Sequence, residues 1–277
     1  MGAMAAREWT RADTAEVVSE PTADDDKYSR GVVGLRTGSA AFPGAAVLGV
    51  EAAWRAGVGM VRFLGPQRAA DLILARRPET VTADGRVQSW VIGSGTDAAH
   101  RSARERAALR AVLGGDVPVV VDAGALDLAA EASAPVVATP HGREHQRLRR
   151  MLGLDPDSDD AAGTARALGG VVVRKGATTV VAAPGTEPIE ITAPTSWLAT
   201  AGTGDVLAGT VGAVIAGVVG RGAPADDLIT MQRAAASAVW LHGHAAALAV
   251  AAHRGGPITA LDVAEHLPHA VADALIG

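Results

Sequence analysis

The chain has 277 residues, of which 48% are hydrophobic and 20% charged, with no cysteine and a formal net charge of −5. This length permits one large α/β domain or two small ones, and the apolar fraction is enough for a substantial core. The absence of cysteine excludes a disulfide scaffold, a thiolate zinc site and a cysteine nucleophile. A negative net charge does not indicate binding driven by phosphate attraction, so we expect no nucleic-acid partner.

The cations are divided very unevenly between the two basic residue types. Lys and Arg total 25, and only Lys27 and Lys175 are lysines. An ammonium is a compact charge, whereas a guanidinium is a planar fork. A lysine kept in such a chain either does something that arginine cannot do or has survived compositional drift, and composition alone favours drift.

Residues 1–26 are expected to form a polar leader. The first residues lack the apolar core of a signal peptide, and residues 10–26 are polar, acidic and rich in small side chains. We expect this leader to be poorly ordered or to pack only loosely.

Further along, no purely apolar run reaches the length of about 18 residues that spans a membrane. The longest uncharged run, residues 206–220, suits a buried helix, so we expect a soluble cytoplasmic protein without a membrane partner.

Short β-branched runs alternate with Ala-rich segments along most of the chain. We expect strands at residues 32–35, 59–64, 89–92, 117–121, 135–138, 171–174 and 178–183, the last two forming a hairpin. We expect helices at residues 44–56, 97–113, 144–152 and 160–168, then at 205–219, 226–252 and 259–276. Several strands are apolar throughout, which is typical of a parallel sheet covered on both faces. Residues 27–277 are therefore predicted to form a single three-layer α/β/α domain with a mostly parallel central sheet and a helical C-terminal part.

A loop of small residues leads directly into the helix expected at 205–219. It contains Gly202, Thr203 and Gly204, and Asp205 is the only charged residue between positions 191 and 220. Glycines let backbone N–H groups approach a ligand, and a helix N-terminus carries partial positive charge, so the loop is a natural anion site. Asp205 is either a helix N-cap or a catalytic base. An anion site gains nothing from a carboxylate unless that group acts on the bound substrate, which favours the base.

Four other segments are expected to converge on this loop. They are Lys-Tyr-Ser-Arg-Gly at 27–31, the Gly/Ser loop and helix start at 37–48, Gly-Ser-Gly-Thr-Asp at 93–97, and Thr-Pro-His-Gly-Arg-Glu at 139–144. Each segment alone is a weak signal. Together they are expected at the carboxyl edge of the sheet, where ligands bind in parallel α/β folds.

The order and spacing of these motifs resemble the ADP/ATP-dependent NAD(P)H-hydrate dehydratases, which have the ribokinase-like fold. The resemblance covers nearly all of residues 27–250. It is carried by the segments at 27–31, 43–48, 56–59, 93–95, 121–126, 139–144, 175–179, 199–205 and 241–243. Among them, Lys175, Gly176, Ala177 and Thr179 resemble a Lys-Gly-x-x-Thr nucleotide segment, and residues 199–205 resemble Ala-Thr-Gly-Gly-Thr-Gly-Asp.

The resemblance implies repair of hydrated NADH or NADPH. ADP or ATP would phosphorylate the ring hydroxyl, Asp205 would take the hydroxyl proton, and phosphate would then leave. The N–H groups of Gly202, Thr203 and Gly204 would stabilise the transferring phosphoryl group. Nucleotide binding would involve Lys175, Gly176, Ala177, Thr178, Thr179 and Gly204, and the hydrated cofactor would contact Ala45, Gly95, His141 and Asp205. Glu144 would organise Mg²⁺ through water.

The resemblance also implies a homotetramer, and glycines between positions 209 and 217 would allow close packing of helices. Many relatives carry an epimerase domain before this one, and here we expect only the short leader.

The chain departs from the family pattern near the expected substrate side. Gly124 stands in place of an acidic residue, Ser94 of a proline, Ala201 of a glycine, Arg36 of a Gly-Gly-Ser turn residue, and Thr195, Ser196 and Trp197 of an Asn-Pro-Gly-like stretch. Two alternatives stay open. One is a small-molecule kinase of the same fold that acts on a thiazole- or pyridoxal-type alcohol. The other is a nucleotide-binding homologue with altered or lost dehydratase activity.

Overall fold

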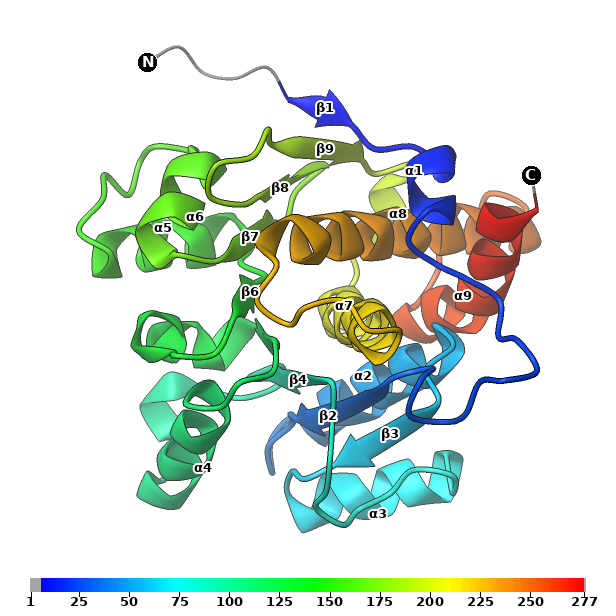
Figure 1. Ribbon diagram of the computed structural model, residues 1–277, viewed down its shortest axis with the longest axis horizontal. Helices are drawn as coiled ribbons and strands as arrows, with labels where there is room; N and C mark the ends of the chain where they lie inside the picture. Colours follow the sequence, from blue (N-terminus) through cyan, green and yellow to red (C-terminus); the bar gives the residue numbers. More distant parts are fainter. Residues whose placement is uncertain (1–5, 277) are drawn as a thin grey trace.

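One mostly parallel sheet runs through the computed structural model, which describes residues 6–276 (Figure 1). The described strands follow the order β1-β9-β8-β7-β6-β5-β4-β2-β3. Their bounds are β1 Arg7–Glu8, β2 Val32–Arg36, β3 Met60–Phe63, β4 Ser89–Ile92, β5 Val119–Val121, β6 Val136–Ala138, β7 Val171–Arg174, β8 Thr178–Ala182 and β9 Ile189–Thr192. Only β8 runs antiparallel to its neighbours β7 and β9, which confirms the mostly parallel sheet and the predicted hairpin.

Helices connect the strands and then fill the C-terminal part. They are α1 Arg11–Ala15, α2 Pro43–Arg55, α3 Gln67–Arg76, α4 Ala103–Leu113, α5 Gly142–Met151, α6 Ala161–Leu168, α7 Thr203–Gly220, α8 Leu228–Ala252 and α9 Ala260–Leu275. Three short 3-10 segments, η1 Ala98–His100, η2 Ala123–Glu131 and η3 Ser196–Leu198, complete the described elements. The helix expected at 97–113 is therefore interrupted, because Asp97 caps η1 and Ser102 caps α4 separately.

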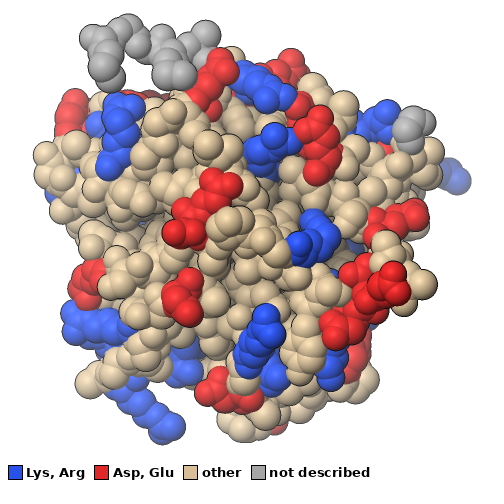
Figure 2. Space-filling model, viewed as in Figure 1, with Lys and Arg blue, Asp and Glu red and all other residues tan. Residues whose placement is uncertain are grey.

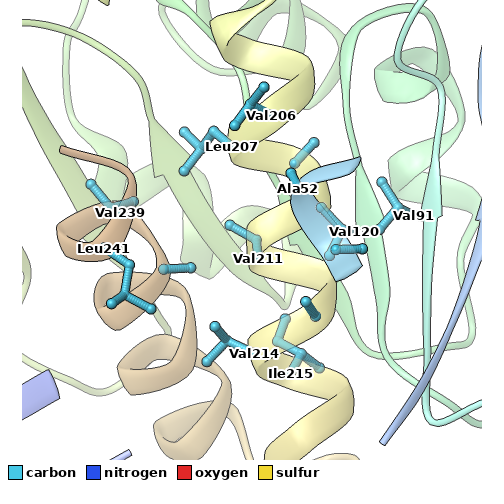
Figure 3. Close-up of a cluster of buried hydrophobic side chains, with 14 of the residues drawn as sticks. Ala52, Val91, Val120, Val206, Leu207, Val211, Val214, Ile215, Val239 and Leu241 are labelled. Carbon is cyan, nitrogen blue, oxygen red and sulfur yellow. The ribbon is translucent and has the colours of Figure 1, made fainter. Parts of the chain in front are cut away.

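The sheet separates two apolar layers, as the three-layer prediction requires. Val120 of β5 faces the layer that contains α2, α7, α8 and α9, whereas Val119 and Val121 face the layer with α4, α5 and η2. In Figure 3, Val211 and Ile215 of α7 lie in the middle of the first layer, between α8 and the sheet. This alternation within an all-valine strand is what covered, fully apolar strands require.

Helix α7 is the central helix of this layer. Both α7 and α8 are long and apolar enough to cross a membrane, yet 78% and 67% of their most apolar windows are buried inside the protein. The prediction of a buried helix at 206–220 is thus confirmed. The glycines of α7, expected to allow packing between copies, pack inside the chain instead. A Cβ on Gly209 would lie 2.3 Å from the carbonyl oxygen of Gly49 in α2, and one on Gly212 would lie 2.2 Å from Val91 of β4.

The first part of the leader packs more firmly than predicted, whereas residues 19–26 are almost all exposed. Trp9 is only 3% exposed, and its indole N–H donates to the Thr14 hydroxyl at 3.1 Å. Strand β1 extends the sheet beside β9, and α1 packs on α8 and α9. The acidic composition hid these few anchors, which are enough to fix a short segment. Residues 1–5 lie outside the described part of the chain, and the single-domain assignment of 27–277 stays a prediction.

A buried carboxylate joins three helices at one edge of the α2 layer. The carboxylate of Glu51 on α2 accepts hydrogen bonds from Arg55 at 2.5 Å, from Arg77 at 2.5 Å and from Arg76 at 3.0 Å. Arg76 also pairs with Glu265 of α9 at 3.4 Å. Three guanidinium groups hold the pKa of Glu51 at about 2, although burial alone would raise it.

Charges on the molecular face viewed in Figure 2 are mixed. Lys and Arg side chains are interspersed with Asp and Glu side chains on that face. Mixed charges of this kind largely cancel at a distance, so that face carries no strong field of one sign.

Candidate active site

Asp122 joins the carboxyl ends of four adjacent strands, β4 to β7. It follows β5 directly, is 2% exposed, and accepts a hydrogen bond from the Ser94 hydroxyl after β4 at 2.9 Å. Its other oxygen accepts from the Thr139 hydroxyl after β6 at 2.7 Å and from the Lys175 ammonium after β7 at 2.8 Å. Burial alone would raise the pKa of Asp122, but Lys175 and the two hydroxyls lower it, so this carboxylate is charged.

The Lys175 ammonium lies between Asp122 and the start of α7. A Cβ built on Gly204 would be 3.6 Å from Lys175 Nζ, so the backbone of Gly204 faces the ammonium directly. Burial alone would lower the pKa of Lys175, yet the carboxylates of Asp122, Glu144 and Asp205 raise it above its ordinary value. Lys175 is therefore a fixed positive charge at the edge of the sheet, beside a helix N-terminus.

Asp205 lies in the first turn of α7 and does not cap the helix. The N-cap is Gly202, with φ +92 and no side-chain hydrogen bond, so the N-cap reading of Asp205 is wrong. Burial and the Asp122 carboxylate together raise the pKa of Asp205 to about 6, although the Lys175 ammonium opposes them. None of the described residues donates a hydrogen bond to the Asp205 carboxylate. Its pKa of about 6 is close to neutral pH, where a general base works best.

Of the three backbone donors expected in the loop before Asp205, the Thr203 N–H is already engaged. The Thr203 N–H already donates to the Thr200 carbonyl at 3.4 Å, and the Thr203 hydroxyl donates to the same carbonyl at 2.8 Å. Within residues 6–276, the N–H groups of Gly202, Gly204 and Asp205 have no acceptor. An anion at this helix start would therefore be held by N–H groups such as those of Gly204 and Asp205 and by Lys175.

A cavity of about 690 Å³ opens next to this loop, a size typical of small-molecule sites. It lies between the β7–β8 turn, the connection from β9 to α7, and α8. Of the expected nucleotide residues, those that line it are Lys175, Gly176, Ala177, Thr179 and Gly204. Thr178 does not line it, and its hydroxyl lies 3.3 Å from that of Thr192 across the β8–β9 pair. The remaining wall includes apolar side chains of Ile191, Leu198, Leu207 and Val239.

His141 and Glu144 begin helix α5 beside this cavity. The His141 side chain accepts from the Arg143 N–H at 3.2 Å, and the Glu144 carboxylate accepts from the His141 N–H at 2.9 Å, which completes a capping box. His141 lines the cavity with a side chain that is 52% exposed. One Glu144 oxygen is thus committed to the helix cap. Across the described residues, no three His, Asp or Glu side chains gather to hold a metal ion.

Ala45 and Gly95 lie together between the loops that follow β2 and β4. A Cβ on Gly95, at φ +66, would be 2.4 Å from the Cβ of Ala45, so only glycine allows this approach. The Gly38 N–H donates to the Ser94 carbonyl at 2.7 Å and ties the two loops together. Both expected cofactor contacts therefore adjoin Ser94, a partner of Asp122.

The segment at 27–31 lies far from the site, contrary to expectation. Gly31 packs against Ala216 and Gly217, and the Ser29 carbonyl faces Gly220, at the C-terminal end of α7. Asp205 is at the other end of this helix, whose 18 residues span about 27 Å. The reason is topological: residues 27–31 precede β2 and so reach the amino edge of a parallel sheet.

The departures from the family pattern have local explanations in most cases. Arg36 forms a two-bond ion pair with Glu105 on α4, at 2.7 and 3.0 Å. A Cβ on Gly124 would lie 2.3 Å from the Thr96 carbonyl oxygen, so this backbone leaves no room for an acidic side chain. Trp197 in η3 is 44% exposed, and nothing in the structure explains its place there.

Sequence reasoning gave no role to Asp122 or to His242. A signal for Asp122 exists, because it ends the apolar run of β5 at the ligand edge. His242 lies on α8, is 7% exposed, lines the cavity, and has its Nε2 3.0 Å from the Thr203 carbonyl oxygen. Its place in the sequence, inside a long apolar helix, gave no sign of this contact.

The sheet topology, the two helical layers and the cavity at the strand ends define a three-layer α/β protein of the ribokinase-like fold. A family model described as NAD(P)H-hydrate dehydratase matches residues 33–269, and the chain belongs to this family.

Two curated relatives and one solved structure are similar to the chain. The bifunctional NAD(P)H-hydrate repair enzyme Nnr of Mycobacterium leprae is 41% identical over 94% of this chain and 55% of its own length. The ADP-dependent (S)-NAD(P)H-hydrate dehydratase of Neisseria meningitidis is 32% identical over 80% of this chain and 78% of its own length. The ADP/ATP-dependent NAD(P)H-hydrate dehydratase of Bacillus subtilis, co-crystallised with ATP/Mg²⁺, has a TM-score of 0.80 at 28% identity and covers 97% of this chain and 98% of its own. The chain spans about half the length of the bifunctional relatives.

Proposed function

We propose that the chain restores NADH and NADPH from their hydrated forms, with ADP or ATP as phosphoryl donor and Asp205 as the base. The observation that carries the proposal is the unpaired carboxylate of Asp205, which lies beside two free N–H donors and the Lys175 ammonium. Family membership supports the choice of substrate.

The chemistry follows from the need for a good leaving group. Hydroxide leaves a saturated ring poorly, so the ring hydroxyl must first be phosphorylated. The hydroxyl oxygen attacks the terminal phosphorus of the nucleotide, its proton passes to the Asp205 carboxylate, and the bond from phosphorus to the nucleotide breaks. The N–H groups of Gly204 and Asp205 and the Lys175 ammonium offset the negative charge of the transferring phosphoryl group. The carbon–oxygen bond then breaks, phosphate leaves, and loss of a ring proton restores the double bond.

The ligands would divide the site between them. The nucleotide would occupy the cavity beside Lys175, Gly176, Ala177 and Thr179, with its phosphates toward Gly204. The hydrated cofactor would meet Asp205 from the side of Ala45 and Gly95, with His141 at the boundary.

The residues of this site fit Mg²⁺ only through water, without a direct protein ligand. Glu144 has one carboxylate oxygen outside the α5 cap, and the Asp122 oxygens are already held by Lys175 and two hydroxyls. Glu144 would therefore hold Mg²⁺ through water, with the nucleotide phosphates as direct ligands. The bound ion would neutralise phosphate charge.

The same proposal includes a homotetramer in the cytoplasm. Light scattering of the purified protein and fractionation of cells test these two points.

The deciding experiment incubates the protein with hydrated NADH and either ADP or ATP and follows the return of NADH absorbance. We expect recovery with at least one nucleotide. Asp205→Asn should abolish turnover while nucleotide still binds, and Asp226→Asn, a change at an exposed carboxylate, should keep activity. Failure of folded protein with both nucleotides would refute the proposal, and phosphorylation of a thiazole- or pyridoxal-type alcohol instead would favour the kinase alternative.

A further inference from the structure

His242 presents a hydrogen-bond acceptor to the cavity next to Asp205. Its Nε2 lies 3.0 Å from the Thr203 carbonyl oxygen. A carbonyl oxygen only accepts hydrogen bonds, so Nε2 must carry the hydrogen. Burial and the Lys175 ammonium lower the pKa of His242 to about 4, although the contact with the Thr203 carbonyl opposes them, so the ring is neutral at pH 7. In a neutral ring with its hydrogen on Nε2, Nδ1 keeps a free lone pair.

Nδ1 is open to the cavity rather than sealed in the core. His242 is 7% exposed and lines the cavity, and Nδ1 receives no hydrogen bond from residues 6–276. Nδ1 is not among the fully buried side-chain atoms that lack a hydrogen-bond partner in residues 6–276, so it keeps some exposure to the cavity. A ligand that fills the cavity displaces water from Nδ1, and an acceptor then left without a partner is costly, so a bound molecule that donates to Nδ1 binds more tightly than one that does not.

The surroundings of His242 match the nucleoside end of a nucleotide. Val239 lies one turn earlier on α8 and Leu207 one turn after Thr203 on α7, and both line the cavity beside the imidazole. The charged end of the cavity is formed by Lys175. Phosphates at the charged end leave the nucleoside at the apolar end. The hydroxyls that line the cavity rotate and can donate or accept, whereas His242 Nδ1 can only accept, so among the lining side chains it can select a donor.

We propose that His242 is a specificity-determining and positioning residue with one role for each ring nitrogen. Nδ1 accepts a hydrogen bond from the nucleoside part of the bound nucleotide, either from a ribose hydroxyl or from the 6-amino group of adenine. Nε2–H holds the Thr203 carbonyl and with it the first turn of α7 that carries Asp205. The identification of the occupant as a nucleotide rests on the proposed function.

Two variants separate these roles because each amide side chain replaces one nitrogen. His242→Gln places an amide N–H near the position of Nε2 and lacks an acceptor at Nδ1. His242→Asn places its amide near Nδ1 and cannot reach the Thr203 carbonyl. His244→Gln is the matched control on the same helix, because His244 stacks on Trp240 and pairs with Asp273 at 2.8 Å, away from the cavity lining.

Calorimetry measures the affinity of each protein for ADP, 2′-deoxy-ADP, 3′-deoxy-ADP and purine riboside 5′-diphosphate, which lacks the 6-amino group. For the wild type we expect one analogue to bind about tenfold more weakly than ADP, the effect of one lost hydrogen bond to a buried acceptor. The identity of that analogue tells which donor meets Nδ1. His242→Gln should bind ADP and that analogue alike, and His244→Gln should keep the wild-type ratio. The inference is wrong if ADP does not bind the wild type, if no analogue is discriminated, or if His242→Gln keeps the ratio.

The positioning role has its own measurement, which does not depend on nucleotide. Hydrogen exchange at the amides of residues 206–208, in the first hydrogen-bonded turn of α7, should be faster in His242→Asn and unchanged in His242→Gln. Equal exchange in all three proteins would contradict it. Should His242→Gln fail to fold, the imidazole nitrogen spectrum of the wild type decides the first role. ADP should shift the Nδ1 resonance of the neutral, buried histidine and the discriminated analogue should not, and an unchanged resonance with ADP overturns the inference.

Failure here is distinguishable from failure of the proposed function. Discrimination among nucleotides without return of NADH refutes the dehydratase proposal and leaves the His242 inference standing. Return of NADH without discrimination refutes the His242 inference alone.

Discussion

Asp205→Asn is expected to stabilise the folded protein at neutral pH while it removes the base. The pKa of this carboxyl is about 6 in the folded protein against an ordinary value of 3.8, because burial and the nearby Asp122 disfavour its ionised form. Between these two pH values the folded state binds a proton that the unfolded state has released. The free energy of unfolding therefore falls as pH rises from about 4 to 6 and stays lowered above that.

The size of this effect follows from the difference between the two pKa values. The difference corresponds to at most about 3 kcal/mol at pH 7 and above, and nothing below pH 4. Asp205 is partly accessible, and solvent screening reduces that figure, so we expect a gain of about 1–3 kcal/mol on substitution. For a chain of this size each kcal/mol raises Tm by roughly 2–4 °C.

Thermal unfolding at pH 7.5 and at pH 4 measures the effect, with Asp226→Asn as the control. We expect a higher Tm for Asp205→Asn at pH 7.5, a difference near zero at pH 4, and no change for the control at either pH. A lower Tm at pH 7.5, or the same change at both pH values, would refute the reasoning. Such a result would mean that the carboxylate stabilises α7 and is not held unpaired for chemistry.

Three further substitutions test the charges around the site and the fold. Lys175→Arg should weaken ADP binding about tenfold or more, measured by calorimetry, because a planar fork cannot replace a compact ammonium. Asp122→Asn removes a negative charge that raises the pKa of Asp205, so the acid limb of the kcat/KM profile should move to lower pH, and an unmoved limb would contradict the coupling. Glu51→Gln should lower the free energy of unfolding in urea at pH 7 by about 3 kcal/mol, because it removes a buried carboxylate that three partly exposed guanidinium groups share. The pKa of Glu51 is about 2 in the folded protein and 4.5 ordinarily, so its contribution is complete above pH 4.5 and disappears as pH falls through about 2.

Matched controls separate these effects from general disturbance. Lys27→Arg changes the chain's other lysine, far from the cavity, and should leave ADP affinity unchanged. Glu131→Gln breaks an exposed pair with Arg110 at 2.7 Å and should cost less than about 1 kcal/mol. Equal losses for Glu131→Gln and Glu51→Gln would contradict the argument from burial.

Much of the sheet could be predicted because its strands are fully apolar. Continuous valine runs such as β5 mark strands covered on both faces. Because the sheet is mostly parallel, the loops that follow its strands could be predicted to meet at one edge. Strand β9, Ile189–Thr192, was missed because its residues alternate between buried and exposed and it is only four residues long. The packing of residues 7–17 was missed for a different reason: the buried Trp9 anchors this segment although its acidic neighbours remain in solvent.

The site was predictable at the level of loops and not at the level of hydrogen bonds. Motif spacing placed Asp205 at a helix start, but only the structure shows that its carboxylate is unpaired and that the Thr203 N–H is already engaged. The position of Asp122 at the end of β5 indicates the ligand edge, but its hydrogen-bond partners follow three other strands, so no local pattern predicts those contacts. Residues 27–31 were expected at the site, but they precede β2 and therefore lie at the amino edge of the sheet.

The two lysines differ once their surroundings are compared. Lys27 lies at the amino edge of the sheet with its ammonium 5.4 Å from the ring centre of Tyr28, a contact that arginine makes at least as often. Lys175 has Asp122 at 2.8 Å on one side and the backbone of Gly204 on the other, so a wider guanidinium would displace the start of α7. It also lowers the pKa of Asp205, against burial and Asp122, and so keeps the base ionised at neutral pH. Compositional drift therefore explains Lys27, whereas a compact cation is required at Lys175.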